Sequence, residues 1–365
     1  MTNKLTEKNE QEVLTDVPLP NRDMFIQEQF LTLFPILKPI LHNEEIERFF
    51  EQQESRANKW KQIFARWGRI SLIIVCALLI LLSWRLSLAR LSIQLPHVIN
   101  YLAAVFGLVA VTIQISLAAS RAHSKWLYAR FVAERVRLWK YQCFLDGELV
   151  SLLEGQVDDF NLEFANRWTL FTAQFKGGGG ALSEFMESSP FDACAPSSDY
   201  RSQAIFSEVR KAYQIFRMDV QKAHLAYMNK VLETADSWTD AVARITLLIS
   251  GVVVIIDACL VGAGFFGWNF ETTGWGAILA AILGGSALSM AIVSAGIRVY
   301  RKGSAITEER ERYRFKQLQL RRIDDQLQQT TDSNGAMALM NRAELVCTEE
   351  LQEFLKAFTH ADYFL

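Results

Sequence analysis

The stretch that decides the fold is ITLLISGVVVIIDACLVGAGFFG, residues 245–267, in which Asp257 is the single charged residue. A helix needs about 20 mostly apolar residues to cross the hydrocarbon core of a bilayer. A helix on the surface of a soluble protein buries only one stripe of side chains, so its charged residues recur at much shorter intervals. We therefore expect residues 245–267 to form a helix that spans a membrane.

Three more stretches have the same character, at residues 68–88, 98–119 and 275–297. The first is the shortest in charge-free length, because Arg85 interrupts it and has to reach the membrane interface. Together the four stretches predict an all-α, polytopic membrane protein with two transmembrane hairpins. The segments that we expect are a disordered tail at 1–20, N-terminal cytoplasmic helices at 21–67, hairpin 1 at 68–119, a helical cytoplasmic connector at 120–244 with a loop at 177–199, hairpin 2 at 245–297, and C-terminal cytoplasmic helices at 298–365.

The segments outside the hairpins have the pattern of long amphipathic helices. Apolar residues three or four positions apart, such as Val132, Val136, Trp139 and Cys143, lie on one face of a helix. A second helix is predicted over residues 148–176. From residue 202 onward no helix breaker precedes the span at 245–267, which predicts one long helix running into it.

Lysine and arginine near the ends of the spans predict the orientation of the hairpins. Arg85 and Arg90 are the only lysine or arginine residues between spans one and two. The loop between spans three and four, WNFETTGW at 268–275, contains no lysine or arginine. The opposite ends of the spans are rich in both. Those residues are Arg56, Lys59, Lys61, Arg66, Arg69, Arg121, Lys125, Arg130, Arg135, Arg137, Lys230, Arg244, Arg298, Arg301, Lys302, Arg310 and Arg312. Both termini and the connector are therefore expected in the cytoplasm.

Composition and motifs argue against several classes of function. With 38 Lys and Arg against 40 Asp and Glu, the chain lacks the basic excess of a nucleic-acid-binding protein. The five cysteines form no CxxC pair and the five histidines are isolated from one another, so we expect no metal. The motifs GxxxxGK[ST], HExxH and GxSxG are absent. We expect no enzymatic activity and no cofactor.

The two hairpins resemble each other in their flanking sequences. ANKWKQIFAR at 57–66 precedes the first hairpin, and ADSWTDAVAR at 235–244 precedes the second. After the hairpins come ERVR at 134–137 and ERYR at 311–314, at nearly the same offset. This similarity predicts an internal duplication in which both copies have the same orientation. Many transporters have inverted repeats instead, so the pattern argues against an alternating-access carrier.

Both halves also resemble the SLATT family, a two-helix membrane domain that would be present here in tandem. The first half has WLYARFVAERVRLW at 126–139, which includes Trp126, Arg130, Glu134 and Arg137. The second half has the pattern Tyr213-x3-Arg217-x3-Gln221-x5-Tyr227, and ends with Glu344, Glu349 and Glu350 around an apolar stripe. The resemblance covers roughly residues 50–145 and 205–358.

The resemblance implies a membrane effector of prokaryotic conflict systems, which forms an oligomeric pore when a nucleotide-linked sensor is triggered. It thereby implies the bacterial inner membrane as the location. The expected partners are membrane lipid, further copies of the chain and a nucleotide-signalling or sensor protein, but no nucleic acid. The family has no catalytic residues to transfer. Two alternatives stay open: a non-conducting scaffold or sensor that binds partners through its cytoplasmic helices, and a small transporter coupled to protons.

Asp257 is the most informative single residue, because an ionised carboxylate in the middle of a span costs about 2.5–3.5 kcal/mol. It could line a pore or accept a proton, or it could be hydrogen bonded to Gln114 or Thr112 of a neighbouring helix. Small residues in the fourth span allow close helix packing. They are Gly276, Ala280, Gly284, Gly285 and Ser289, and either the third span of the same chain or another protomer could pack there.

Overall fold

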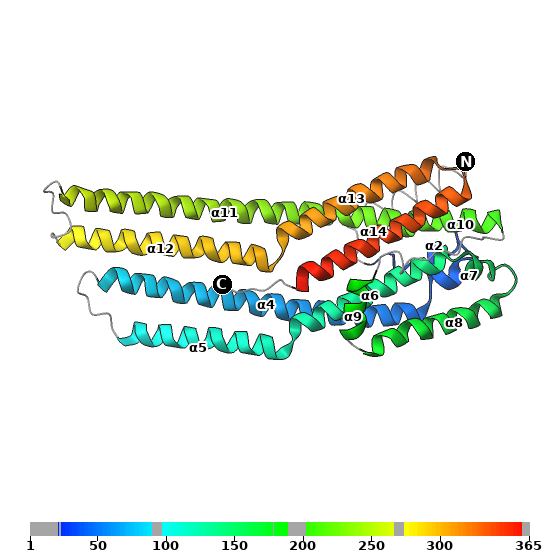
Figure 1. Cartoon of the computed structure of the whole chain (residues 1–365), viewed down its shortest axis with the longest axis horizontal. Helices are drawn as coiled ribbons and strands as arrows, with labels where there is room; N and C mark the ends of the chain where they lie inside the picture. Colours follow the sequence, from blue (N-terminus) through cyan, green and yellow to red (C-terminus); the bar gives the residue numbers. More distant parts are fainter. Residues whose placement is uncertain are drawn as a thin grey trace. The chain divides into compact units, whose positions relative to one another are not determined.

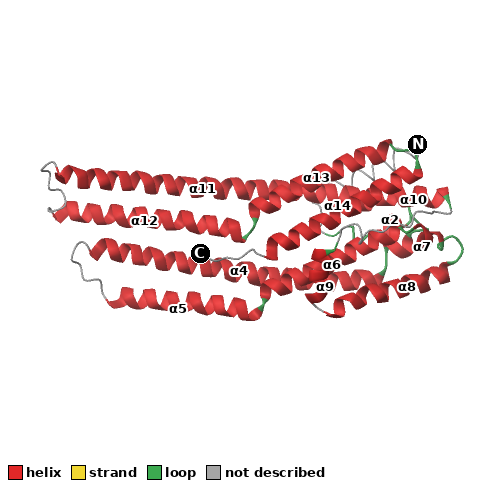
Figure 2. Cartoon of the chain, viewed as in Figure 1, coloured by secondary structure: helices red, strands yellow, loops and turns green. Residues whose placement is uncertain are grey.

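The computed structural model describes residues 21, 23–89, 97–177, 179–188, 202–265 and 274–359. These residues form helices joined by short turns and include no strand, so the prediction of an all-α fold is confirmed (Figure 2). Four helical runs in the described part of the chain are long and apolar enough to cross a membrane. The predicted disordered tail at 1–20 and the loops at 90–96 and 266–273 lie outside the described residues.

In the first half of the chain, two short helices precede a very long helix, and two further helices follow it (Figure 1). Asn43 starts the long helix, because its side-chain oxygen accepts hydrogen bonds from the backbone N–H groups of Glu45 and Ile46 at 3.2 Å. The helices of this half are α2 (Glu28–Leu31), α3 (Lys38–Leu41), α4 (Glu44–Ala89), α5 (His97–Ser120) and α6 (Ala122–Leu145).

The helices of the second half include a similar succession, a very long helix followed by two shorter ones. They are α10 (Gln203–Tyr213), the π-helix η3 (Gln214–Asp219), α11 (Val220–Phe265), α12 (Gly274–Gly303), α13 (Ile306–Gln329) and α14 (Ser333–Thr359). The very long helices, α4 and α11, both have 46 residues, and the second helices after them, α6 and α13, both have 24. Arg121 and Ala305, which directly precede α6 and α13, both have left-handed backbone with φ of 50° and 47°. These shared features support the predicted duplication.

The connector between the halves differs from its prediction in two places. The helix expected over 148–176 is divided into α7 (Gly147–Ser151), α8 (Val157–Ala173) and the 3-10 turn η1 (Gln174–Gly177). Gly155, with φ of 103°, makes the turn that separates α7 from α8. Within the expected loop at 177–199, residues Gly179–Glu187 form helix α9, because buried Phe185 packs its ring on Phe131 at 5.2 Å. Residues 189–199 of that loop lie outside the described residues.

The chain divides into two compact units. Unit 1 contains the described residues up to Lys59, together with Ser124–Val231 and Glu308–Thr359. Its core is rich in aromatic side chains, and the largest cluster surrounds Trp139, whose ring lies 5.0–5.3 Å from the rings of Phe164, Trp168 and Phe171. This cluster holds α8 against α6.

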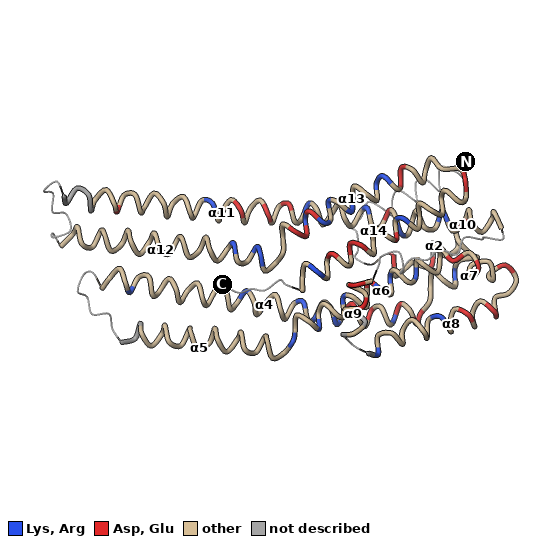
Figure 3. Tube along the Cα trace, viewed as in Figure 1, with Lys and Arg blue, Asp and Glu red and all other residues tan. Residues whose placement is uncertain are grey.

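Unit 2 contains Trp60–His123 and Leu232–Thr307, and therefore most of the four apolar helical segments. Figure 3 shows that charged residues are sparse along these segments of α4, α5, α11 and α12. The polarity of the unit is inverted relative to a soluble protein. Leu86, Leu108 and Leu248 are exposed, whereas Ser71, Ser250 and Ser294 are buried.

Buried hydroxyl groups connect the helices of unit 2. Ser250 and Ser294 donate hydrogen bonds to the backbone oxygens of Ala287 and Ala243, both at 2.8 Å, and join α11 to α12. Gln114 of α5 donates to the hydroxyl of Ser71 of α4 at 2.7 Å. Hydrogen bonds of this kind hold helices together where the surroundings supply no water.

Candidate functional site

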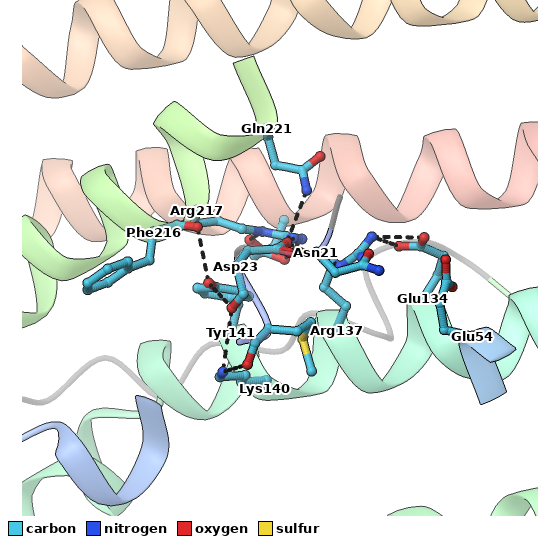
Figure 4. A network of polar contacts seen from close by, with 12 residues as sticks. Asn21, Asp23, Glu54, Glu134, Arg137, Lys140, Tyr141, Phe216, Arg217 and Gln221 are labelled. Carbon is cyan, nitrogen blue, oxygen red and sulfur yellow. Dashed lines mark hydrogen bonds and ion pairs between the residues drawn. The ribbon is translucent and has the colours of Figure 1, made fainter. Parts of the chain in front are cut away.

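Arg217, in the π-helix η3, is at the centre of a buried charge cluster in unit 1 (Figure 4). Its side chain is only 2% exposed. Its Nε and Nη2 atoms each donate to a different oxygen of Glu344 at 2.8 Å, which is the bidentate geometry of a strong guanidinium–carboxylate pair. The hydroxyl of Tyr213 donates to the same carboxylate at 2.8 Å. The cluster consists of Asp23, Glu54, Arg130, Glu134, Arg137, Lys140, Arg217 and Glu344.

Asp23 connects the two halves of the chain within this cluster. One of its carboxylate oxygens lies 3.1 Å from Nε of Arg137 on α6 and 3.3 Å from Nη1 of Arg217. Gln221 of α11 donates to the same oxygen at 3.2 Å. The backbone oxygen of Asp23 accepts from the hydroxyl of Tyr141 at 2.8 Å. A single residue before α2 therefore contacts α6, η3 and α11.

At the other end of the cluster, carboxylates and guanidinium groups alternate. Arg130 pairs with Glu54 at 2.9 Å and with Glu134 at 2.5 Å, and Arg137 pairs with Glu134 at 2.7 Å. Burial alone would raise the pKa of Glu134, but Arg130 and Arg137 outweigh burial and lower the pKa to about 2. Glu134 is therefore ionised at neutral pH. The pair of Arg130 with Glu54 joins α6 to α4, and Asp23 joins α6 to η3 by pairing with both Arg137 and Arg217.

Lys140 of α6 is buried in a different way, because its hydrogen bonds go to backbone oxygens. Its ammonium group donates to the carbonyls of Met24 at 3.0 Å and Leu41 at 2.9 Å, and lies 3.4 Å from that of Asp23. The side chain is 1% exposed. Burial lowers the pKa of Lys140 to about 8, and the carboxylates of Glu47 and Asp23 offset only part of this effect.

This pKa leads to a pH-dependent stability. Between pH 8 and the ordinary lysine pKa of 10.5, the unfolded chain binds a proton at Lys140 that the folded chain has lost. The contribution of Lys140 to stability therefore rises with pH, by roughly 2 kcal/mol between pH 7 and pH 9.5. We expect the unfolding free energy of the wild type minus that of Lys140→Met to increase by this amount in urea titrations.

The comparison with Lys140→Met is necessary because burial also raises the pKa of Cys143 and Tyr141, which makes the folded protein less stable as the pH rises. Both groups are present in the wild type and in Lys140→Met, so their contribution cancels in the difference. Lys125→Met is a suitable control, because Lys125 is exposed. A difference that is constant from pH 7 to about pH 9.5 would show that Lys140 has an ordinary pKa in the folded state.

The structure brings together most of the residues of the SLATT-like patterns. Tyr213, Arg217, Gln221, Arg130, Glu134 and Arg137 all belong to the buried charge cluster or contact it. Trp126 lies elsewhere in unit 1, with its ring 5.1 Å from that of Phe358, and Tyr227 is exposed. Glu344 pairs with Arg217, whereas Glu350 pairs with Arg312 and Lys316. Most residues of the patterns therefore form or contact core ion pairs.

Three residues of this region were not expected from the sequence. Lys140 had a recognisable signal, because it shares the apolar face of α6 with Val136 and Cys143. Asp23 and Tyr141 had none, because the contacts of Asp23 join positions more than a hundred residues apart. In the part of the chain that the structure describes, no group of three or more His, Cys, Asp or Glu side chains could hold a metal ion.

Asp257 is half-buried in the apolar part of α11. Its Oδ1 atom is buried and accepts no hydrogen bond from the described residues. Gln114 bonds to Ser71, and exposed Thr112 donates to the Leu108 carbonyl of its own helix at 2.8 Å. Neither residue is hydrogen bonded to Asp257.

The small residues of α12 lie on more than one face of the helix. Gly276 and Gly285 are buried, Ala280 and Gly284 are half-buried, and the hydroxyl of Ser289 donates to the carbonyl of Gly285 at 2.7 Å. A Cβ atom at Gly285 would lie 2.9 Å from the Trp84 ring, and one at Gly296 would lie 2.6 Å from Sγ of Cys76. The small residues thus bring α12 against α4, which contains the first predicted span, in addition to α11.

The comparisons with known proteins give one match. The sequence model of a family of proteins of unknown function, DUF4231, matches residues 48–148. This segment includes α5 and α6 and nearly all of α4, and it coincides with the first of the two SLATT-like segments. No curated protein and no solved structure matches the chain.

Proposed function

We propose that the chain is a membrane protein in which the apolar helices of unit 2 form two transmembrane hairpins. The support is the inverted polarity of the unit, because a surface of exposed Leu, Ile and Val is stable in lipid and would aggregate in water. The apolar segments also have exposed aromatic residues near their ends, as lipid interfaces favour. These residues are Trp67, Tyr101, Trp238 and Trp275.

The proposed orientation has unit 1 and both termini in the cytoplasm, and it is supported by the lysine and arginine residues near the span ends. Charged pairs are concentrated at those ends. Arg301 of α12, for example, pairs with Asp240 at 2.7 Å. The bacterial inner membrane is the location that the SLATT resemblance implies.

The function that the structure supports best is that of an oligomeric pore or channel, gated from the cytoplasmic side and similar to SLATT effectors. The observation that carries this proposal is Asp257, a carboxyl group in an apolar helix with a buried oxygen atom that has no hydrogen-bond partner among the described residues. Ionisable groups within membrane spans generally belong to ion or proton pathways. Because α4 and α12 touch directly at Gly285 and Gly296, the path would run between protomers.

The pore proposal predicts the effect of Asp257→Asn, which removes the charge and keeps the size of the side chain. We expect expression of the wild type to depolarise bacterial cells, and purified protein to release dye from liposomes. Asp257→Asn should reduce the rate of release by about tenfold or more, because the favourable site for a cation or proton is lost. The matched control is Ile256→Ala, an exposed apolar neighbour on α11 that should leave the rate unchanged.

The alternative is a non-conducting scaffold that binds a cytoplasmic partner through unit 1. Two apolar side chains that are exposed on α8, Leu162 and Leu170, favour it. A scaffold would retain its function in Asp257→Ala. Wild-type protein that neither depolarises cells nor releases dye would contradict the pore and leave the scaffold.

A further inference from the structure

The π-helical segment η3 lies within an uninterrupted helical run from Gln203 to Phe265. In a π-helix the hydrogen bonds join residues five apart, so each turn contains more residues than an α-helical turn. Single π turns inside α-helices are rare and are frequent at functional sites. Arg217 of the buried charge cluster belongs to this segment.

The π turn determines which side chains share a face of the helix. In α geometry each residue is rotated by about 100°, so Gln221 would point roughly 80° away from Tyr213. In the structure, Tyr213 and Arg217 bind the same carboxylate of Glu344, and Arg217 and Gln221 bind the same oxygen of Asp23. The wider turn lets all three side chains reach this pair of carboxylates.

The side-chain contacts that favour the π geometry come from outside the helical run. Glu344 belongs to α14, and Asp23 precedes α2. Tyr141 of α6 donates to the carbonyl of Phe216 at 3.2 Å, and its ring lies 4.6 Å from Cζ of Arg217. Phe34 packs edge-on against Phe216, with ring centroids 5.5 Å apart. The π geometry itself is rare compared with α geometry.

We propose that η3 switches between a π-helical and an α-helical state. Contraction from π to α geometry rotates α11 about its own axis by about 100°, the angle between successive residues of an α-helix. The observed register after η3 is held by two polar pairs between α11 and α13. Lys222 lies 2.5 Å from Asp324, and Asn229 donates to Gln317 at 2.7 Å. These pairs keep the contracted form a minority until the contacts of Arg217 weaken.

The contraction has a definite geometric signature. After the contraction, the side chain of each residue that follows η3 points in the direction in which the side chain of the next residue points in the π form. Val231 is 43% exposed and Leu232 is 8% exposed, while Glu233 is exposed. On contraction Leu232 would turn outward and Val231 inward. If the proposed pore function holds, the same rotation turns Asp257 to the exposed direction that Ala258 now has.

The test measures the accessibility of single cysteines at positions 231 and 232 in the full-length chain, with the native cysteines replaced. In the observed register, a water-soluble maleimide should label Val231→Cys quickly and Leu232→Cys slowly. With Asp23→Ala added, we expect labelling of Leu232→Cys to rise about tenfold and labelling of Val231→Cys to fall. Where Asp23→Ala fails to fold, Gln221→Ala removes a single contact and gives the same direction of change.

Deletion of Gln214 provides the control, because a chain that is one residue shorter forms α geometry without rotating α11. In this deletion background, Asp23→Ala should no longer make labelling faster at position 232 and slower at position 231. The proposal is overturned if both positions become faster together, which indicates local unfolding, if neither changes, or if this opposite change at the two positions persists in the deletion background. None of these labelling rates depends on ion conduction, so this proposal can fail while the pore proposal holds, and the reverse.

Discussion

Replacing Arg217 with alanine is expected to lower the free energy of unfolding by about 3–5 kcal/mol. The reason is that Glu344 and Asp23 would keep their buried charges and lose the guanidinium group between them. Urea unfolding of the detergent-solubilised protein, followed by tryptophan fluorescence, measures the loss. Arg322→Ala on α13 is the matched control, because Arg322 is exposed.

A second variant separates the cost of an unpaired charge from the loss of packing. In Arg217→Met combined with Glu344→Leu, both members of the bidentate pair are apolar. Because replacing a buried ion pair as a whole is often nearly neutral, the double variant should be more stable than Arg217→Ala. A double variant that is less stable than Arg217→Ala, or a single variant within 1 kcal/mol of the wild type, would contradict a buried ion pair.

The second large effect is expected at Gly296, where α12 approaches α4. A Cβ atom there would lie 2.6 Å from Sγ of Cys76, so either this sulfur atom or one of the helices has to shift. We expect Gly296→Ala to destabilise the protein by about 1–3 kcal/mol. Adding Cys76→Ala removes the obstructing sulfur atom and should restore part of the stability, as measured by thermal unfolding in detergent.

The control for this pair is Gly251→Ala on α11. A Cβ atom at Gly251 meets nothing within 4 Å, so alanine should be neutral or stabilise the helix by up to about 1 kcal/mol. Equal effects of Gly251→Ala and Gly296→Ala would show that helix propensity, and not contact with Cys76, decides the result. An additive response to Gly296→Ala and Cys76→Ala would contradict the direct contact.

The helices were predictable from the sequence because their signals are local. Long apolar stretches and recurring apolar residues depend on neighbouring positions, and they indicated both the four apolar segments and the long helix that continues into residues 245–265. The division between α7 and α8 was missed because it depends on the backbone of one residue, Gly155. The helix α9 was missed because its stability comes from a distant contact of Phe185 with Phe131.

The buried charge cluster was only partly predictable for the same reason. Arg130, Glu134 and Arg137 stand at helical spacing, so their proximity follows from the sequence. Their partner Asp23 is far away in the chain, and no local pattern connects the two. The π turn at η3 was also missed, because the spacing of Tyr213, Arg217 and Gln221 fits an α-helix, and external carboxylates select the wider turn.

The account depends most on the claim that the apolar helices of unit 2 form two transmembrane hairpins, with unit 1 in the cytoplasm. Single cysteines at positions 95, 271 and 162 test it, each in the chain without native cysteines, with an impermeant maleimide on intact spheroplasts. Positions 95 and 271 should be labelled from outside, and Leu162 on α8 only after lysis. Labelling of position 162 in intact cells, or a chain that alkaline carbonate washes off the membrane, would contradict the claim.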